Sequence, residues 1–197
     1  MRTLILAAWL MLPVAFSIWH YGPGQDRLLL DDAARILAEA DGHVRAEEWD
    51  QAVAKYDEAL KLLPPEKLAQ ARGIRLESAK AKMLAKQLST ANSELQALVE
   101  ELKVDAKAEP ELLAEARSAL ANSQYYLTWL MRLEGLPRET WEPEIEAARQ
   151  TYRLLAEESE KQGDASAAKK NCEDLESTIR LARMELNELQ GLPLPSQ

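Results

Sequence analysis

The sequence predicts an all-α protein, with a single N-terminal transmembrane helix followed by an irregular array of about seven helices arranged as hairpins. Alanine and leucine dominate a chain of 197 residues in which glycine occurs 7 times and phenylalanine once, a composition that favours helices. The β-branched and aromatic runs typical of strands are missing. Prolines and glycines separate the long helix-forming segments.

Residues 4–21 form an uncharged apolar run that ends in Trp19, His20 and Tyr21. As a helix this run would be roughly 27 Å long, close to the bilayer's hydrocarbon thickness of about 30 Å. The closing aromatic residues would suit a membrane interface. We therefore predict that residues 1–24 are an uncleaved membrane anchor ended by a Gly/Pro break. A cleaved signal peptide and a buried core helix are the alternatives.

Positive charge flanking this run predicts its orientation. Arg2 and the N-terminal amine outweigh Arg27, which is followed by Asp31 and Asp32. The positive-inside rule then predicts a single-pass membrane protein whose C-terminal domain is extracytoplasmic. The long N-terminal span and the acidic domain suggest a bacterial protein. If the run is cleaved, the domain is exported instead.

The region 25–190 is predicted to be one helical repeat domain, and residues 191–197 a flexible tail. Pro64 and Gly163 end helices, whereas Pro110 and Pro143 are placed where a first helical turn accepts proline. Short links between long helices predict antiparallel neighbours. The predicted helices cover residues 31–46, 48–63, 66–86, 89–103, 110–133, 143–162 and 165–189.

Small and aromatic residues recur at fixed positions in the segment 40–64, namely Ala40, Trp49, Ala52, Tyr56, Ala59 and Pro64. Small side chains let paired helices approach, and Tyr56 can fill the gap behind them. This pattern resembles a tetratricopeptide repeat spanning residues 31–64. The departures are Glu39 and His43, where the family prefers leucine and tyrosine, and Glu47 in place of the turn glycine.

Weaker copies of this pattern follow. The spacing of Ala52, Tyr56 and Ala59 recurs in Ala91, Leu95 and Leu98, and again in Ala148, Tyr152 and Leu155. The helix before each recurrence offers a small contact residue, Ala79 in the first case and Ala121 in the second. The copies are separated irregularly, unlike the family's period of roughly 34 residues. We interpret them as degenerate repeats, although an antiparallel bundle can place alanine and leucine this way by chance.

The last predicted helix carries a heptad seam, which comprises Ala168, Cys172, Leu175, Ile179, Ala182, Leu186 and Leu189. Such a seam can pair with another chain and make a homo-oligomer. Alternatively, the helix caps the exposed end of the array.

The sequence offers little for catalysis, metal binding or cofactor binding. The net charge of −9 disfavours nucleic acid as a partner. His20 falls in the apolar N-terminal run, His43 replaces a buried aromatic residue, and Cys172 belongs to the apolar seam. We find no nucleotide-binding, metal-binding or hydrolase motif, so we predict that the chain is not an enzyme and has no cofactor.

Aromatic residues are concentrated between positions 122 and 143, with a loop containing Trp141 that looks exposed. Aromatic residues and arginine are typical of interface hot spots. Tyr126, Trp129, Arg138 and Trp141 are therefore candidate partner-binding residues. The alternative is that these rings form the core of their hairpin.

The resemblance to tetratricopeptide repeats implies a scaffold that binds a partner protein or peptide in a groove lined by the first helix of each pair. Carried over through the repeat at 31–64, the groove residues are Leu37, Asp41, Val44 and Arg45. A looser alignment through the weaker copies adds Lys80 and Met83. The predicted function is thus a membrane-tethered interaction scaffold. The alternative is a structural subunit that self-assembles through the C-terminal heptad helix.

Overall fold

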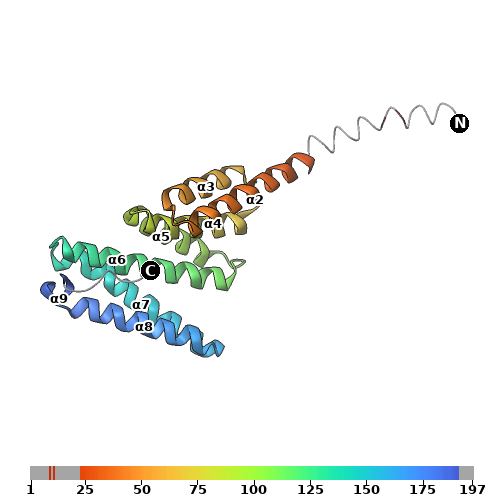
Figure 1. Ribbon diagram of the computed structural model, residues 1–197. Coiled ribbons are helices and arrows are strands. Elements are labelled where there is room, and N and C mark those ends of the chain that lie inside the picture. Colours follow the sequence, from red (N-terminus) through yellow and green to blue (C-terminus); the bar gives the residue numbers. More distant parts are fainter. Residues whose placement is uncertain (1–8, 10, 12–22, 191–197) are drawn as a thin grey trace. The chain divides into compact units, whose positions relative to one another are not determined.

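The computed structural model describes Trp9, Met11 and residues 23–190. Within these residues the chain forms eight helices and no strand (Figure 1). The all-helical part of the prediction is therefore confirmed. The helices are α2 (Pro23–Arg45), α3 (Trp49–Leu62), α4 (Leu68–Leu84), α5 (Leu88–Val104), α6 (Pro110–Leu133), α7 (Arg138–Gln162), α8 (Ala165–Arg183) and α9 (Leu186–Gln190).

The chain divides into two compact units, residues 1–74 and residues 75–197, and α4 runs across the boundary. The predicted limits of the repeat domain, 25–190, and of the tail, 191–197, stay predictions. The tail lies outside the described residues.

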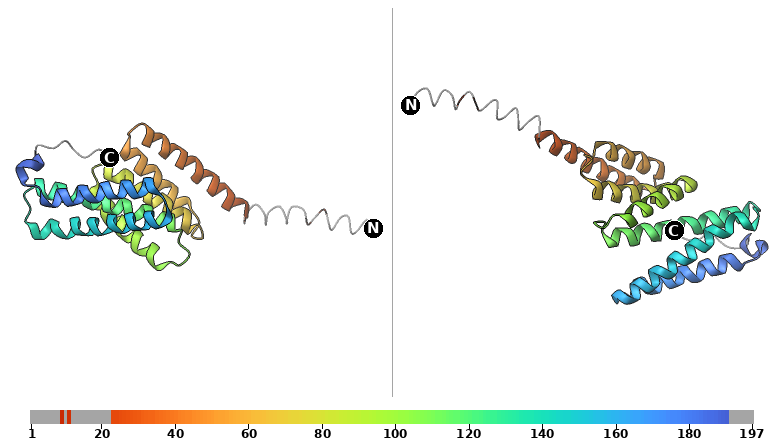
Figure 2. Two further views of the ribbon diagram at one scale, coloured as in Figure 1. Left: turned by 90° about the horizontal axis from the view of Figure 1, so that it is seen from below. Right: turned by 180° about the vertical axis from the view of Figure 1, so that it is seen from behind.

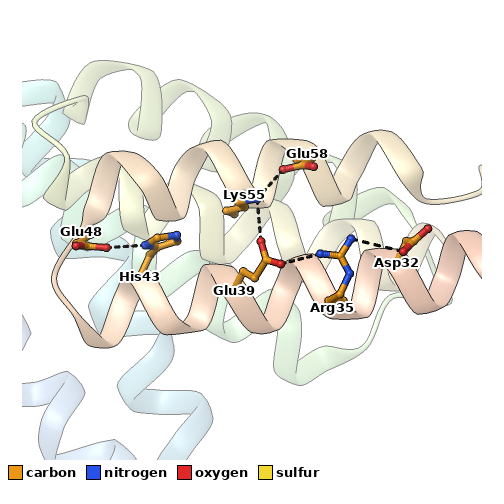
Figure 3. Close-up of polar contacts among 7 residues, drawn as sticks. All are labelled: Asp32, Arg35, Glu39, His43, Glu48, Lys55 and Glu58. Atoms are coloured by element: carbon orange, nitrogen blue, oxygen red, sulfur yellow. Dashed lines mark hydrogen bonds and ion pairs between the residues drawn. The ribbon is translucent and has the colours of Figure 1, made fainter.

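In the first unit, α2 and α3 form an antiparallel hairpin (Figure 3). Apolar residues spaced by three or four positions put one stripe on each helix, and these stripes are buried. The Tyr56 hydroxyl also donates a hydrogen bond to Asp41 on α2, at 3.2 Å. The buried residues of the hairpin are Ala33, Ile36, Ala40, Ala52, Val53, Tyr56 and Ala59.

In the second unit, α5, α6, α7 and α8 pack in succession, each against the next (Figure 2). Leu76 and Ala79 of α4 join the same core through Leu95 and Leu98 of α5. A buried polar contact also joins α5 to α6, since the Ser123 hydroxyl of α6 donates to the Asn92 side chain of α5 at 2.7 Å.

The repeated pattern predicted from the sequence is buried in this unit. None of its members exposes more than 4% of its surface: Ala79, Ala91, Leu95, Leu98, Ala121, Ala148, Tyr152 and Leu155. Alanine at the contact positions allows the close approach of paired helices that the pattern predicts. The structure is thus an all-helical array compatible with a helical-repeat fold.

Four turns between helices share one backbone geometry. Each contains a residue with positive φ, and these residues are Glu47 (58°), Lys86 (61°), Gly135 (74°) and Gly163 (77°). The next N–H donates to a carbonyl in the last turn of the preceding helix, as Gln87 does to Lys82 at 2.9 Å. This is the arrangement of a Schellman cap, and it explains why glycine is the residue expected where Glu47 stands.

The prediction of a membrane-spanning helix, and with it of a single-pass protein with an extracytoplasmic domain, is wrong for the described part of the chain. There, no helix combines the length and the apolar composition that a bilayer crossing requires. Helix α2 begins at Pro23, inside the predicted Gly/Pro break, and carries Asp31, Asp32 and Arg35. The run 4–21 lies outside the described residues, apart from Trp9 and Met11.

Three predicted helix boundaries also differ from the structure. Helix α2 begins before position 31, and α7 begins at Arg138 with Pro143 inside it. The helix predicted over 165–189 is interrupted, because Met184 is extended, at φ −61° and ψ 147°. Leu186 and Leu189 therefore belong to α9, and the predicted heptad seam is not one continuous stripe.

The positive-φ turns give a stability test. A non-glycine residue in this conformation carries a steric penalty that glycine avoids. We expect Lys86→Gly to raise the free energy of unfolding by about 0.5–1 kcal/mol. Urea-induced unfolding would measure the change.

The matched control is Gly163→Ala, which should destabilise the chain. A β-carbon at Gly163 would meet nothing within 4 Å, so any loss reports backbone conformation alone. A stability gain in Gly163→Ala, or a loss in Lys86→Gly, would contradict this account of the turns.

Candidate functional site

The second unit contains a cavity of about 380 Å³. Its walls come from α4, α6, α7 and α8, so the lining residues range from Lys80 to Asp174 in the sequence. Lys80 and Met83, which the resemblance placed in a binding groove, both line it. The lining residues are Lys80, Met83, Leu84, Glu115, Ser118, Ala119, Asn122, Tyr152, Lys170 and Asp174.

Lys80 is held between two carboxylates at one side of the cavity. Its ammonium donates to Glu77 on the same helix at 2.8 Å and to Glu115 on α6 at 2.5 Å. Burial alone would lower the pKa of Lys80, but the hydrogen bonds to Glu115 and Glu77 outweigh it, and the net shift is upward. Lys80 therefore stays charged, and its charge is already matched inside the protein.

Tyr152 of α7 forms part of the cavity wall from within the core. Only 4% of its surface is exposed, and its ring packs with Ala121, Ala148 and Leu155. Burial is the main cause that raises the pKa of Tyr152, and the negative charge of Asp174 adds to it. The phenol is therefore protonated, and its hydroxyl has no hydrogen-bond partner in the part of the chain that the structure describes.

Asp174 of α8 is a half-buried carboxyl group at the cavity. Burial raises the pKa of Asp174, Lys170 lowers it, and Glu173 raises it further, with a net upward shift. Among the described residues, Asp174 has neither a hydrogen bond nor an ion pair. The carboxylate has thus lost part of its hydration without gaining an internal partner.

The groove residues predicted from the first repeat belong to the first unit. Leu37 and Val44 are half-buried, and Arg45 is exposed. Asp41 is exposed but accepts the hydrogen bond from Tyr56. These residues stay a prediction for partner binding.

Polar pairs across the α2–α3 hairpin explain the departures from the repeat pattern (Figure 3). Glu39 pairs with Lys55 of α3 at 2.8 Å and with Arg35 of its own helix at 2.7 Å. Hydrogen bonding to Lys55 is the main cause that lowers the pKa of Glu39. His43 Nδ1 lies 2.6 Å from Glu48. The hairpin thus has polar contacts at the two positions where the repeat pattern expects leucine and tyrosine.

The predicted exposed loop around Trp141 is instead the start of α7. Trp141, Trp129 and Tyr126 are buried, with 8%, 8% and 9% of their surfaces exposed. The two tryptophans pack with Ile145, Leu181 and Leu189, so they form the core of this hairpin. Pro143 lies inside α7 and cannot donate a backbone hydrogen bond, and Trp141 and Ile145 on either side of it are buried.

Two arginines flank Trp141 differently. Arg132 lies 4.8 Å above the ring and donates to the carbonyls of Leu181 and Met184, which close the end of α8. Arg138 lies 6.0 Å from the ring centroid. Its side chain is exposed and pairs with Glu142, at 2.9 Å from Nε. Of the predicted aromatic-segment residues, Arg138 alone is exposed.

Sequence reasoning missed Lys170 and Asp174 as cavity residues. A usable signal existed, because Ala156 and Ala168 have the same separation as Ala40 and Ala52 and flank a turn that contains Gly163. All four alanines are buried. That repetition predicts that α7 pairs with α8, which makes the residues in the first turns of α8 candidates for a site.

No group of three or more His, Cys, Asp or Glu side chains is placed to hold a metal ion within the described residues. No protein-family model matches the sequence, and comparison with curated proteins finds no match.

The raised pKa of Asp174 has a consequence for stability. A carboxyl group whose pKa rises on folding contributes stability while protonated, and this contribution is lost as pH rises through the folded-state pKa. We therefore expect Asp174→Asn to be at least as stable as the parent chain at pH 7. The difference should shrink towards about pH 4, near the ordinary carboxyl pKa.

Urea unfolding midpoints at the two pH values would measure this effect. The matched control is Glu160→Gln, at an exposed residue of α7. This control should show no such pH-dependent difference. A clear loss of stability in Asp174→Asn at pH 7 would contradict the description of Asp174 as an unpartnered carboxylate.

Proposed function

We propose that this chain is a protein-interaction scaffold of the tetratricopeptide-repeat type, and that it binds a partner protein or peptide through the cavity of the second unit. The observation that carries the proposal is the cavity wall. Its side chains come mainly from α4, α6 and α8, and they include polar groups that the chain leaves without internal partners.

The repeat pattern supports this function. Three pairs of buried alanines, in the α2–α3, α4–α5 and α6–α7 hairpins, leave the helices little freedom to shift. A binding surface built on such helices is ordered before the partner arrives, which reduces the entropic cost of association.

The character of the cavity also suits a peptide. It combines the apolar side chains of Met83, Leu84 and Ala119 with the polar side chains of Ser118 and Asn122. Binding sites commonly join an apolar wall to a few polar groups that fix orientation. That the chain is not an enzyme stays a prediction.

Site-specific photocrosslinking in the cells that express the protein would test the proposal. We expect the photoreactive substitution Asn122→p-benzoylphenylalanine, inside the cavity, to give one discrete adduct that mass spectrometry identifies. The same substitution at Gln96, an exposed residue of α5, should give no such adduct.

A blocking variant makes the test specific. Met83→Glu places a charge against the apolar wall and should remove the Asn122 adduct while circular dichroism shows an intact helical fold. Equal crosslinking from both positions, or no adduct from Asn122, would contradict the proposed binding surface. An adduct that contains a second copy of the chain would favour self-assembly instead.

A further inference from the structure

Two polar groups at the cavity have unused hydrogen-bonding capacity. The Asp174 carboxylate and the Tyr152 hydroxyl form no hydrogen bond with any residue that the structure describes. Tyr152 is 96% buried, since only 4% of its surface is exposed, and it nevertheless lines the cavity. Neither group is a fully buried atom, since Oε1 of Gln124 is the one buried side-chain atom without a partner among the described residues. Both groups are therefore open to water at the cavity, where a ligand that donates hydrogen bonds can take the place of that water.

The charges around the cavity favour a cation over an anion. Lys80, which lines the cavity from α4, is already paired with Glu77 and Glu115. Lys170 is exposed to solvent and forms no ion pair with Asp174, although its charge acts on that carboxyl group. The lining thus holds two lysines and two carboxylates, and Glu77 adds a third carboxylate beside Lys80. Among these carboxylates, Asp174 is the one that has no ion pair with a described residue. The net charge of −9 over the whole chain acts in the same direction.

We propose that the cavity takes a basic side chain, arginine or lysine, of the partner, with its charged end at Asp174 and Tyr152. The guanidinium or ammonium group donates to the Asp174 carboxylate and to the Tyr152 hydroxyl oxygen. Its aliphatic stem packs on Met83 and Leu84, as long basic side chains do along apolar surfaces. The inference rests on the proposed function in that the side chain belongs to a partner.

The contribution of each contact can be ranked. The pair with Asp174 joins two charged groups in a half-buried position, so it should dominate binding. The contact with Tyr152 joins a cation to a neutral hydroxyl and should contribute less. Removing the carboxylate charge should weaken binding by about tenfold or more, the factor expected for a hydrogen bond between charged groups.

The test uses small probes and needs no knowledge of the partner. The isotope-labelled full-length chain is titrated with N-acetyl-arginine amide, N-acetyl-lysine methylamide and N-acetyl-citrulline amide, and amide chemical shifts are followed by NMR. We expect saturable shifts near Asn122, Tyr152 and Asp174 with the arginine or lysine probe. The uncharged citrulline probe should give none.

Variants assign the effect to its residues. Asp174→Asn should weaken binding of the basic probe by about tenfold, Tyr152→Phe should weaken it less, and the control Glu160→Gln should leave it unchanged. Equal shifts from citrulline, shifts outside the cavity, no saturable shift at all, or unaltered binding to Asp174→Asn would each overturn the inference. Comparison of the two basic probes decides between arginine and lysine.

The inference and the proposed function can fail separately. Probe binding that depends on Asp174, without a crosslinked partner at Asn122, would retain the cation site and remove the scaffold function. A crosslinked partner whose affinity is unchanged by Asp174→Asn would retain the scaffold and remove the cation site.

Discussion

The close approach of paired helices at buried alanines is the constraint on which the rest of this structure depends. Ala40 and Ala52 occupy the α2–α3 hairpin, and Ala79 and Ala91 occupy the α4–α5 hairpin at the same separation. A larger side chain at these positions would push the helices apart, because protein interiors have no spare volume. The positive-φ turns at Glu47 and Lys86 then follow, since the chain must reverse direction within a few residues.

The cavity in the second unit is lined by residues of the core and of the helix surfaces. The core residues Tyr152 and Ala119 reach its wall from the interior, whereas Lys80, Glu115 and Asp174 come from the surfaces of three different helices. Lys80 forms ion pairs with neighbouring carboxylates, whereas Asp174 forms none among the described residues. The fold thus gains no hydrogen bond or ion pair from Asp174 there, which is what the proposed binding role requires.

The sequence predicted the helices and the buried repeat positions well, because both depend on local spacing. Tyr56, Leu95 and Tyr152 are buried where the spacing placed them. The cavity could not be predicted in the same way, since Asp174 reaches its wall only when α8 packs beside α7. The sequence misplaces Trp141 because a proline at position 143 predicts a helix start there, whereas α7 begins at Arg138. The membrane-spanning helix was inferred from the composition of residues 4–21 alone.

The most direct test of the central claim is an enlargement of one alanine contact. Ala91 is fully buried on α5, whereas Ala97 is exposed on the same helix. Urea unfolding of Ala91→Leu and Ala97→Leu would compare one substitution in two environments. The account predicts a loss of about 1–3 kcal/mol at Ala91 from overpacking and a change within about 0.5 kcal/mol at Ala97. Equal stability of the two variants would contradict it.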